Sequence, residues 1–431
     1  MPYNSTNSDK PGPLEGVRVI DITTFILGPF ASQFLGDMGA DVIKVENPNG
    51  GDHTRASANT QKGFSANFLN NNRSKRSVAL NLKEDAARQA LLRLCRDADV
   101  FIQNFRPGVV DHMGIGEADV RAVAPDIIYV SICGFGDTGP YAAKPVYDPL
   151  IQALSGLATV QAGSDAERPR LVRTILPDKL TGTVAAQAIT AALLARTRTG
   201  KGQHIHVSML DTILAFLWGS DMGSQTFIDN PFPQQNAASF IDLIYETADG
   251  HISVAVQSDR EWQSLTRAFD KPEWLDDPRF KSPALRQENI NARLNLTQDV
   301  LKTDTSEMWL KRLDAEDVPC APVLTRSEAI NHPQVTINAI VMETDHHLAG
   351  GVRQARPAAR FSGTPIDIRR GAPALGEHTA AILSEAGYSE DEIAAISEKV
   401  AELKSENASL DKSMADATST RKEENSDFVA K

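Results

Sequence analysis

The chain has 431 residues, 41% of them hydrophobic, and a formal net charge of −12 at pH 7. This length exceeds what one simple core organises, so we expect one large and one small domain. The acidic balance argues against a nucleic-acid partner, because such proteins need a basic surface to neutralise phosphates. Small anionic ligands stay possible, since local basic clusters can hold them.

The cysteines and the apolar runs predict the cellular location of the protein. Three cysteines, Cys95, Cys133 and Cys320, lie far apart without CxxC spacing, which favours a reducing, cytoplasmic location over a disulfide framework. No apolar run approaches the ~20 residues that a membrane helix requires. We therefore expect a cytoplasmic protein with no membrane partner.

The first half of the chain alternates short apolar segments with segments of helical spacing. Strands are predicted for residues 17–23, 40–46, 77–82 and 99–105, and helices for residues 30–39 and 84–98. Such alternation indicates parallel strands joined by right-handed crossovers. The predicted fold class is α/β, with a Rossmann-like open parallel sheet in the large domain and a smaller α+β domain.

Changes in composition divide the chain into five parts. We predict a disordered leader (1–13), the first part of the large domain (14–225), the small domain (226–325), a return to the large domain (326–400) and a polar tail (401–431). The tail is rich in Lys, Glu, Ser and Asp. It cannot bury enough apolar surface to offset chain entropy, so we expect it to be disordered.

Asp178 is the most informative single residue. It follows Pro177 and opens an alanine-rich helix that is predicted to continue to Arg198. Acidic residues are favoured at helix starts, so the local sequence favours a structural cap. The alternative is a nucleophile, because a helix N-terminus and nearby donors keep a carboxylate ionised and oriented. Both interpretations stay open at this point.

Two polar segments flank the predicted strands. Residues 71–76 (NNRSKR) precede one strand, and residues 104–108 (NFRPG) end the next. Open α/β folds bind ligands beyond their strand ends, where clustered cations and backbone donors suit a phosphate group. Solvated loop charges explain the same composition equally well.

Two further motifs are weak. Gly134–Gly139 matches GxGxxG after a predicted strand, but a dinucleotide site needs a helix to begin there, and Pro140 follows. His204 and His206 share one face of a predicted strand, yet no further ligand stands at a supporting spacing, so we predict no metal.

Several ordered motifs resemble the family III CoA-transferases, which include formyl-CoA transferase, carnitine CoA-transferase and α-methylacyl-CoA racemase. The resemblance covers roughly residues 13–395. The segments that carry it are Pro13–Asp21, Gly28-Pro29, Gly36–Glu46, Gly51-Asp52 with Arg55, Asn104–Gly108, Gly134–Gly136 with Gly139-Pro140, Thr199–Gln203 and Leu375–Thr379.

The resemblance implies a fold, an assembly and a mechanism. It implies an interlocked, ring-like homodimer of chains that each have a Rossmann-like large domain and a small domain. It places Asp178 as the nucleophile that attacks an acyl-CoA thioester, passing through an aspartyl mixed anhydride and an aspartyl-CoA thioester. The partners are then an acyl-CoA and a carboxylic acid, with no permanently bound cofactor.

The resemblance also implies a set of CoA-binding residues: Arg73, Lys75, Arg76, Leu80, Asn104, Phe105, Arg106, Met113 and Tyr147. Tyr147 fills the position where the racemases carry a proton-transferring histidine. A tyrosine with a pKa near ~10 is a poor base for an α-proton, which favours transfer. The alternatives are a 2-methylacyl-CoA racemase, for which Asp259 is a candidate second acid, and a non-catalytic CoA-binding protein.

Three departures from the formyl-CoA transferase pattern affect the expected substrate. Ile26 replaces a glutamine near the acyl group, Asn47 replaces an arginine that contacts CoA, and residues 234–239 replace a glycine-rich lid. The apolar loop around Ile26 predicts a larger or less polar acyl group. Arg170 and Arg173 are candidates for pairing with the free end of a dicarboxylate, or are solvated charges.

Overall fold

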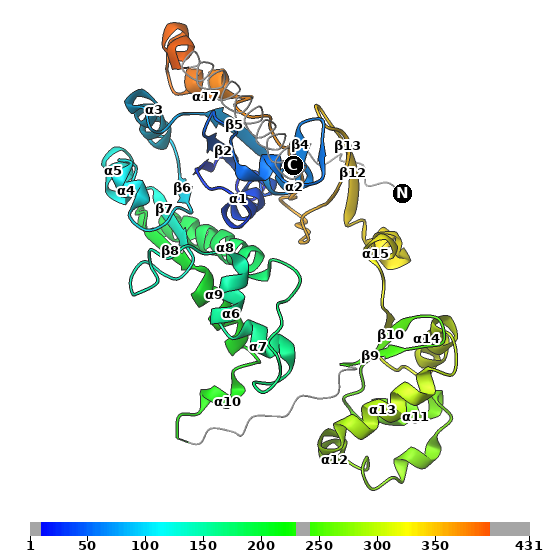
Figure 1. The fold of residues 1–431 in the computed structure, drawn as a ribbon. Helices are drawn as coiled ribbons and strands as arrows, with labels where there is room; N and C mark the ends of the chain where they lie inside the picture. The colour runs from blue at the N-terminus through cyan, green and yellow to red at the C-terminus, as the bar shows by residue number, and fades with distance from the viewer. Residues whose placement is uncertain (1–9, 230–241, 397–431) are drawn as a thin grey trace, which may run out of the picture. The chain divides into compact units, whose positions relative to one another are not determined.

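The computed structural model describes residues 10–229 and 242–396. The predicted tail, most of the predicted leader and residues 234–239 therefore lie outside the described residues. The chain divides into two compact units, which are described separately (Figure 1). Among these residues, unit 1 comprises residues 10–158, 171–223 and 339–396, and unit 2 comprises residues 159–170, 224–229 and 242–338. Unit 2 thus includes an early segment and ends later than the predicted small domain.

Unit 1 is built on a six-stranded sheet with the order β5-β2-β1-β6-β7-β8. Every adjacent pair is parallel. The strands are β1 (Arg18–Asp21), β2 (Asp41–Glu46), β5 (Lys75–Ala79), β6 (Val100–Gln103), β7 (Ile128–Cys133) and β8 (His204–Ser208). The predicted α/β fold with a parallel sheet is confirmed.

Helices cover both faces of this sheet, as Figure 1 shows. On one face, Val19, Val100 and Val130 share a core with α1 (Leu27–Asp37), α8 (Leu176–Thr199) and α9 (Met209–Trp218). On the other, Ile20 and Phe101 pack with α3 (Asp85–Cys95), α5 (Glu117–Val123) and α17 (Thr379–Glu385). Successive strand residues point to opposite faces, so burial on both sides explains the continuous apolar runs in the sequence.

A close contact between two helices and several shorter elements complete unit 1. Gly182 lets α8 lie close to α1, because a Cβ there would stand 2.7 Å from the carbonyl oxygen of Leu27. The remaining elements are η1 (His53–Ala56), β3 (Thr60–Gln61), β4 (Phe64–Ser65), α2 (Ala66–Asn72), α4 (Val109–His112), α6 (Asp148–Leu154), α7 (Leu157–Ala162, which reaches into unit 2), β12 (Val341–His346) and β13 (Gly350–Ala355).

Unit 2 has an antiparallel sheet with the order β11-β10-β9, covered by helices. Its core is aromatic and includes Trp262, Phe280 and Trp309. The elements are α10 (Gly223–Thr226, which begins at the end of unit 1), β9 (Ile244–Glu246), β10 (His251–Val254), α11 (Asp259–Ala268), η2 (Pro272–Leu275), α12 (Pro283–Glu288), α13 (Ile290–Leu301), α14 (Ser306–Ala315), β11 (Cys320–Pro322), α15 (Arg326–Asn331) and α16 (Pro333–Asn338).

The strand order locates the place where a ligand is expected. The chain moves outward from β1 through β2 to β5 and then crosses back to β6 on the other side of β1. The carboxyl ends of β1 and β6 therefore form a topological switch point, where open α/β sheets bind their ligands. No helix within residues 10–229 and 242–396 has the length and apolar character to cross a membrane.

Candidate active site

A cavity of about 500 Å³ lies in unit 1 at the carboxyl ends of β1, β6 and β7. Its walls come from the loops after these strands and from the starts of α1, α6, α8 and α9. Apolar side chains form one part, namely Phe25, Ile26, Leu27, Ile132, Pro145, Val146, Pro149, Ile175 and Met209. Gly134 and polar residues form the rest: Thr24, Asn104, Arg106, Cys133, Tyr147, Asp148 and Asp178.

Asp178 lies in the first turn of α8 but does not cap it. The N-cap residue is Ile175, and no side chain there accepts a capping hydrogen bond. The Asp178 backbone N–H donates to Oδ2 of Asp148, with the two atoms 3.3 Å apart. Within the part of the chain that the structure describes, no hydrogen bond or ion pair reaches the Asp178 carboxylate itself. The carboxylate is thus held on a rigid element at the cavity wall with its oxygens uncommitted.

Asp178 and Asp148 form a pair of carboxyl groups with perturbed acidity. Burial, supported by the nearby Asp148 carboxylate, raises the pKa of Asp178 to about 7. Burial also raises the pKa of Asp148, although the Gln152 side-chain amide donates to Oδ1 of Asp148 at 2.6 Å. Like charges this close disfavour double ionisation, so the pair titrates together. Such a pair in a cavity is typical of a functional site.

Asp148 is a candidate site residue that the sequence did not single out. It begins α6 and is 4% exposed. Its contact with Asp178 spans 30 residues and depends on α6 lying beside α8, which no local pattern reveals. The local sequence did carry one signal: Asp148 stands between the extended residue Tyr147 and Pro149, which is a pattern typical of a helix start.

Asn104 joins the loops that follow β1 and β6. Its side chain accepts from the Thr24 backbone N–H at 3.0 Å and donates to the Thr24 carbonyl at 2.9 Å. The next residue, Phe25, has a left-handed backbone with φ of 68°, which is strained for a bulky residue. Its ring stacks on His53 with centroids 4.8 Å apart and meets the edge of Tyr147 at 6.4 Å. These contacts fix the apolar wall beside Asp178.

The structure brings three of the nine predicted CoA-binding residues to this cavity: Asn104, Arg106 and Tyr147. Arg106 and Tyr147 are exposed, and Tyr147 is 68% accessible. Both side chains are therefore free to meet a ligand that enters from solvent. Asn104 instead has its amide engaged in holding the loop, so a role in binding CoA would have to use its remaining hydrogen-bonding capacity.

The basic segment at residues 71–76 turns inward, away from the cavity. Arg73 forms a buried ion pair with Asp37 at 2.8 Å. The Lys75 ammonium is fully buried and donates to Asp21, to the Pro29 carbonyl and to the Asn72 side chain at 3.1, 3.0 and 2.9 Å. Because an ammonium has three donors, Lys75 has none left for a phosphate.

The other four predicted residues also lie outside the cavity. Arg76 pairs with Asp41 and Glu385 at 2.6 and 2.7 Å. Leu80 is fully buried in the core, while Phe105 and Met113 pack against it. The three predicted CoA contacts that remain at the cavity thus come from loops rather than from strand β5.

The structure also shows the surroundings of the glycine-rich motif and of the two strand histidines. After Gly134–Gly139 the chain continues in turns, and the next helix begins only at Asp148, so no helix N-terminus is available for a pyrophosphate. His204 contacts Ser131 at 2.8 Å and His206 pairs with Asp137. No group of three potential metal ligands occurs among the described residues.

Comparison with known proteins now decides the family, since residues 14–379 match CoA-transferase family III. This chain belongs to CoA-transferase family III. The human succinyl-CoA:glutarate CoA-transferase is 33% identical over 391 residues, covering 89% of this chain and 88% of that protein. The acetyl-CoA:oxalate CoA-transferase of Acetobacter aceti is 35% identical over 388 residues, covering 88% and 97%.

A solved structure gives the same result for the fold. A CAIB/BAIF family protein of Brucella suis superposes with a TM-score of 0.77 and 31% identity, covering 88% of this chain and 100% of that chain. Membership of family III, together with relatives that are CoA-transferases, identifies this chain as a CoA-transferase that uses CoA thioesters.

Proposed function

We propose that this CoA-transferase moves CoA from an acyl-CoA to a carboxylic acid with Asp178 as its covalent nucleophile. The observation that carries the proposal is the Asp178 carboxylate itself. It lies at the wall of the switch-point cavity, on the first turn of a long helix, with no partner among the described residues. A nucleophile needs this combination of fixed position and uncommitted oxygens.

The proposed reaction balances without any outside proton or oxidant. The Asp178 oxygen attacks the thioester carbonyl, forming a C–O bond as the C–S bond breaks and CoA thiolate leaves. The thiolate then attacks the aspartyl carbonyl of this anhydride, and the donor acid leaves as its carboxylate. An acceptor carboxylate reverses both steps, which yields the new acyl-CoA and restores Asp178. Because an anhydride hydrolyses readily, the apolar wall of the cavity serves to exclude water.

The cavity supports transfer over racemisation. No histidine lines it among the described residues, and Tyr147 occupies the position where the racemases have one. Asp259, the candidate second acid of a racemase, lies in unit 2 and pairs with Arg286 there. A racemase needs two groups that exchange protons at one carbon, and among the described residues neither a histidine nor Asp259 lines this cavity.

The lining of the cavity suggests the kind of acyl group. Ile26, Ile175 and Met209 supply aliphatic surface beside Asp178, and Arg106 is the cation that lines the cavity in the described part of the chain. We propose that the acyl chain packs on the aliphatic wall and that a dicarboxylic acyl group places its free end toward Arg106. The succinyl and glutarate groups named for the human relative have this form. An interlocked homodimer and a CoA contact by Tyr147 complete the proposal, in which Arg106 is kept for the free carboxylate of the acyl group.

Intact-protein mass spectrometry tests the covalent step. The enzyme is mixed with acetyl-, propionyl-, succinyl- and glutaryl-CoA without an acceptor, and in parallel with a 2-methylacyl-CoA. A CoA-sized adduct on the wild type that is missing from Asp178→Asn supports the proposal and identifies the donor. Deuterium exchange at the α-carbon of the 2-methylacyl thioester, with no adduct from any donor, contradicts it and favours the racemase.

The carboxyl pair predicts a pH dependence. Because Asp178 attacks only as a carboxylate, kcat/KM should rise with pH through an apparent pKa of about 7. Asp148→Asn removes the neighbouring negative charge but keeps an oxygen that accepts from the Asp178 N–H. Loss of this charge favours the ionised form of Asp178. The acidic limb of the kcat/KM profile should therefore move to lower pH by about one unit. Asp211→Asn, an exposed first-turn carboxylate of α9, is the control. If the acidic limb of the kcat/KM profile lies at the same pH in Asp148→Asn as in the wild type, the carboxyl groups of Asp148 and Asp178 are not coupled.

A further inference from the structure

A buried glutamine lies beside the carboxyl pair of Asp148 and Asp178. Gln152 stands on α6, one helical turn after Asp148, and is 2% exposed. Its side chain does not line the cavity that contains Asp178. A buried amide costs free energy unless its donors and its acceptor are bonded, so the partners of Gln152 indicate what it holds in place.

The Gln152 amide is bonded to the chain segment that leads into α8. Its Oε1 accepts from the Val172 N–H at 2.9 Å. Its Nε2 reaches the carbonyl oxygens of Val172 and Thr174 at 3.3 and 3.4 Å. Residues 171–175 form neither helix nor strand, so this side chain takes the place of a neighbouring peptide group. It therefore fixes the segment that ends at Ile175, which precedes α8 and lines the cavity.

The same amide also holds the Asp148 carboxylate. Nε2 of Gln152 donates to Oδ1 of Asp148 at 2.6 Å, while Oδ2 of Asp148 accepts from the Asp178 N–H at 3.3 Å. The orientation of the amide follows from these partners, because only Oε1 can accept from the Val172 N–H and Nε2 then faces the carboxylate. One side chain thus connects the two supports of Asp178, namely the segment before α8 and the carboxylate that binds its N–H.

Gln152 also affects the charge of the carboxyl pair. Burial raises the pKa of Asp148, whereas the Gln152 amide, the Asp178 N–H and the Lys179 ammonium lower it. In the described part of the chain, the other ionisable side chains that line the cavity or stand in the first turn of α9 are Arg106, Cys133, Tyr147 and Asp211. Without the Gln152 donor, Asp148 should hold its proton to higher pH and no longer disfavour the ionised form of Asp178.

We propose that Gln152 is a positioning residue for CoA transfer, because it ties the segment before α8 to the carboxylate that binds the Asp178 N–H. This role presupposes that Asp178 is the nucleophile of the proposed function. Gln152 acts through Val172 and Asp148 and touches no reacting atom. Loss of its hydrogen bonds frees the first turn of α8 to move, and a displacement of about 1 Å costs up to about 10²-fold in rate.

Gln152→Met tests this role, since methionine has a similar length but makes none of these hydrogen bonds. With full-length protein, at a pH well above the acidic limb of the kcat/KM profile, kcat should fall by about 10- to 100-fold. KM for the acyl-CoA should change little, and the acidic limb should move to lower pH than in the wild type. Gln152→Glu keeps an oxygen for the Val172 N–H but adds a third carboxyl group, so its acidic limb should move to higher pH.

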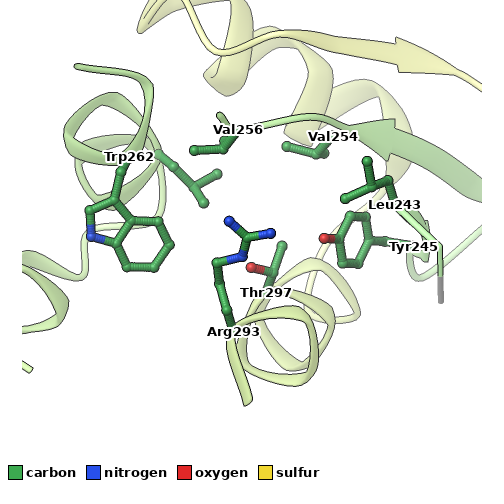
Figure 2. A pocket seen from close by; sticks show the side chains of 8 residues that line it. Leu243, Tyr245, Val254, Val256, Trp262, Arg293 and Thr297 are labelled. Atoms are coloured by element: carbon green, nitrogen blue, oxygen red, sulfur yellow. The ribbon is translucent and has the colours of Figure 1, made fainter. Parts of the chain in front are cut away.

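Unit 2 offers a matched control for the loss of a buried glutamine. Gln298 of α13 is 8% exposed, and its amide pairs with the Glu246 backbone, accepting from the N–H at 3.0 Å and donating to the carbonyl at 2.8 Å. It follows Thr297, which lines the small pocket shown in Figure 2. Gln298→Met removes the same kind of clamp, so it should lower stability but leave both kcat and the acidic limb at wild-type values.

The outcomes separate positioning from a general defect and from the proposed function. Gln152→Met should still form the CoA-sized adduct that Asp178→Asn lacks, only more slowly. The positioning role is overturned if kcat of Gln152→Met stays within about twofold of wild type, or falls no further than in Gln298→Met. An acidic limb at the wild-type pH in both Gln152 variants also overturns it. Circular dichroism checks folding, and Gln152→Glu carries the pH test if Gln152→Met does not fold. A wild type without adduct contradicts the proposed nucleophile itself.

Discussion

Asp178→Asn is expected to reduce the rate of CoA transfer by about 10³-fold or more, because an amide cannot form the anhydride that the covalent route requires. The amide matches the carboxylate in size and remains on the first turn of α8, so the cavity should keep its shape. The expected loss therefore falls on kcat, while KM for the acyl-CoA changes little. Steady-state assays that follow exchange between an acyl-CoA and a free acid measure both constants.

Two controls make this result specific. Asp211→Asn makes the same chemical change in the first turn of the adjacent helix α9, at an exposed position, and should retain full activity. Asp178→Glu keeps the carboxylate but moves it by one methylene, so it should retain a trace of activity and still form an adduct. If Asp178→Asn kept more than about a tenth of the wild-type rate, a covalent role for this residue would be excluded.

The sequence predicted the framework of unit 1 because that framework is encoded locally. Strand β6 begins with the continuous apolar run Val100–Ile102, and the amphipathic α3 shows its apolar face at helical spacing. The position of Asp178 at the start of a helix followed from Pro177 and the alanine-rich segment after it. Each of these signals lies within a few residues along the chain.

The partners of the charged residues could not be predicted in the same way. Lys75 pairs with Asp21, 54 positions earlier, and Arg73 pairs with Asp37, 36 positions earlier. A lysine before a strand has the same local pattern whether it binds phosphate or enters the core. Only the parallel register, in which β5 pairs with β2 and β2 with β1, directs these side chains inward. The contact between Asp148 and Asp178 also spans distant positions, because it depends on α6 lying beside α8.

The buried ion pairs beneath the cavity predict the second large effect, which is on stability. Asp21 and Lys75 are both fully buried, and Asp21 also accepts from Ser32 and Thr23 at 2.6 and 2.5 Å. Burial opposes ionisation, but Lys75, Lys44 and these hydroxyls together lower the pKa of Asp21 to about 2. Asp21→Asn leaves Lys75 without its counter-charge, so we expect a loss of about 3–5 kcal/mol in the free energy of unfolding.

Urea denaturation with a double variant separates charge pairing from a general packing defect. Asp21→Asn combined with Lys75→Met removes both charges, so it should cost less than Asp21→Asn alone by about 1 kcal/mol or more. A loss in the double variant that equals the sum of the losses in Asp21→Asn and Lys75→Met measured singly would show that the two residues act independently. The sign of the pH effect provides another check. A depressed carboxyl pKa stabilises the fold above its unfolded value near ~3.9, so the difference between wild type and Asp21→Asn should shrink as the pH falls below about 4.

The same ion pairs connect stability to the proposed chemistry. Lys44, also fully buried, pairs with Asp52 at 2.9 Å and donates to the Thr23 carbonyl at 2.8 Å. Asp52 in turn accepts from the Phe25 N–H at 3.3 Å, so buried charged side chains hold the start of the cavity-lining loop at Thr23 and at the strained residue Phe25. Asp21→Asn should therefore loosen the apolar wall beside Asp178. In enzyme that is still folded, we expect a larger fraction of the acyl-CoA to be hydrolysed rather than transferred, because water then reaches the anhydride.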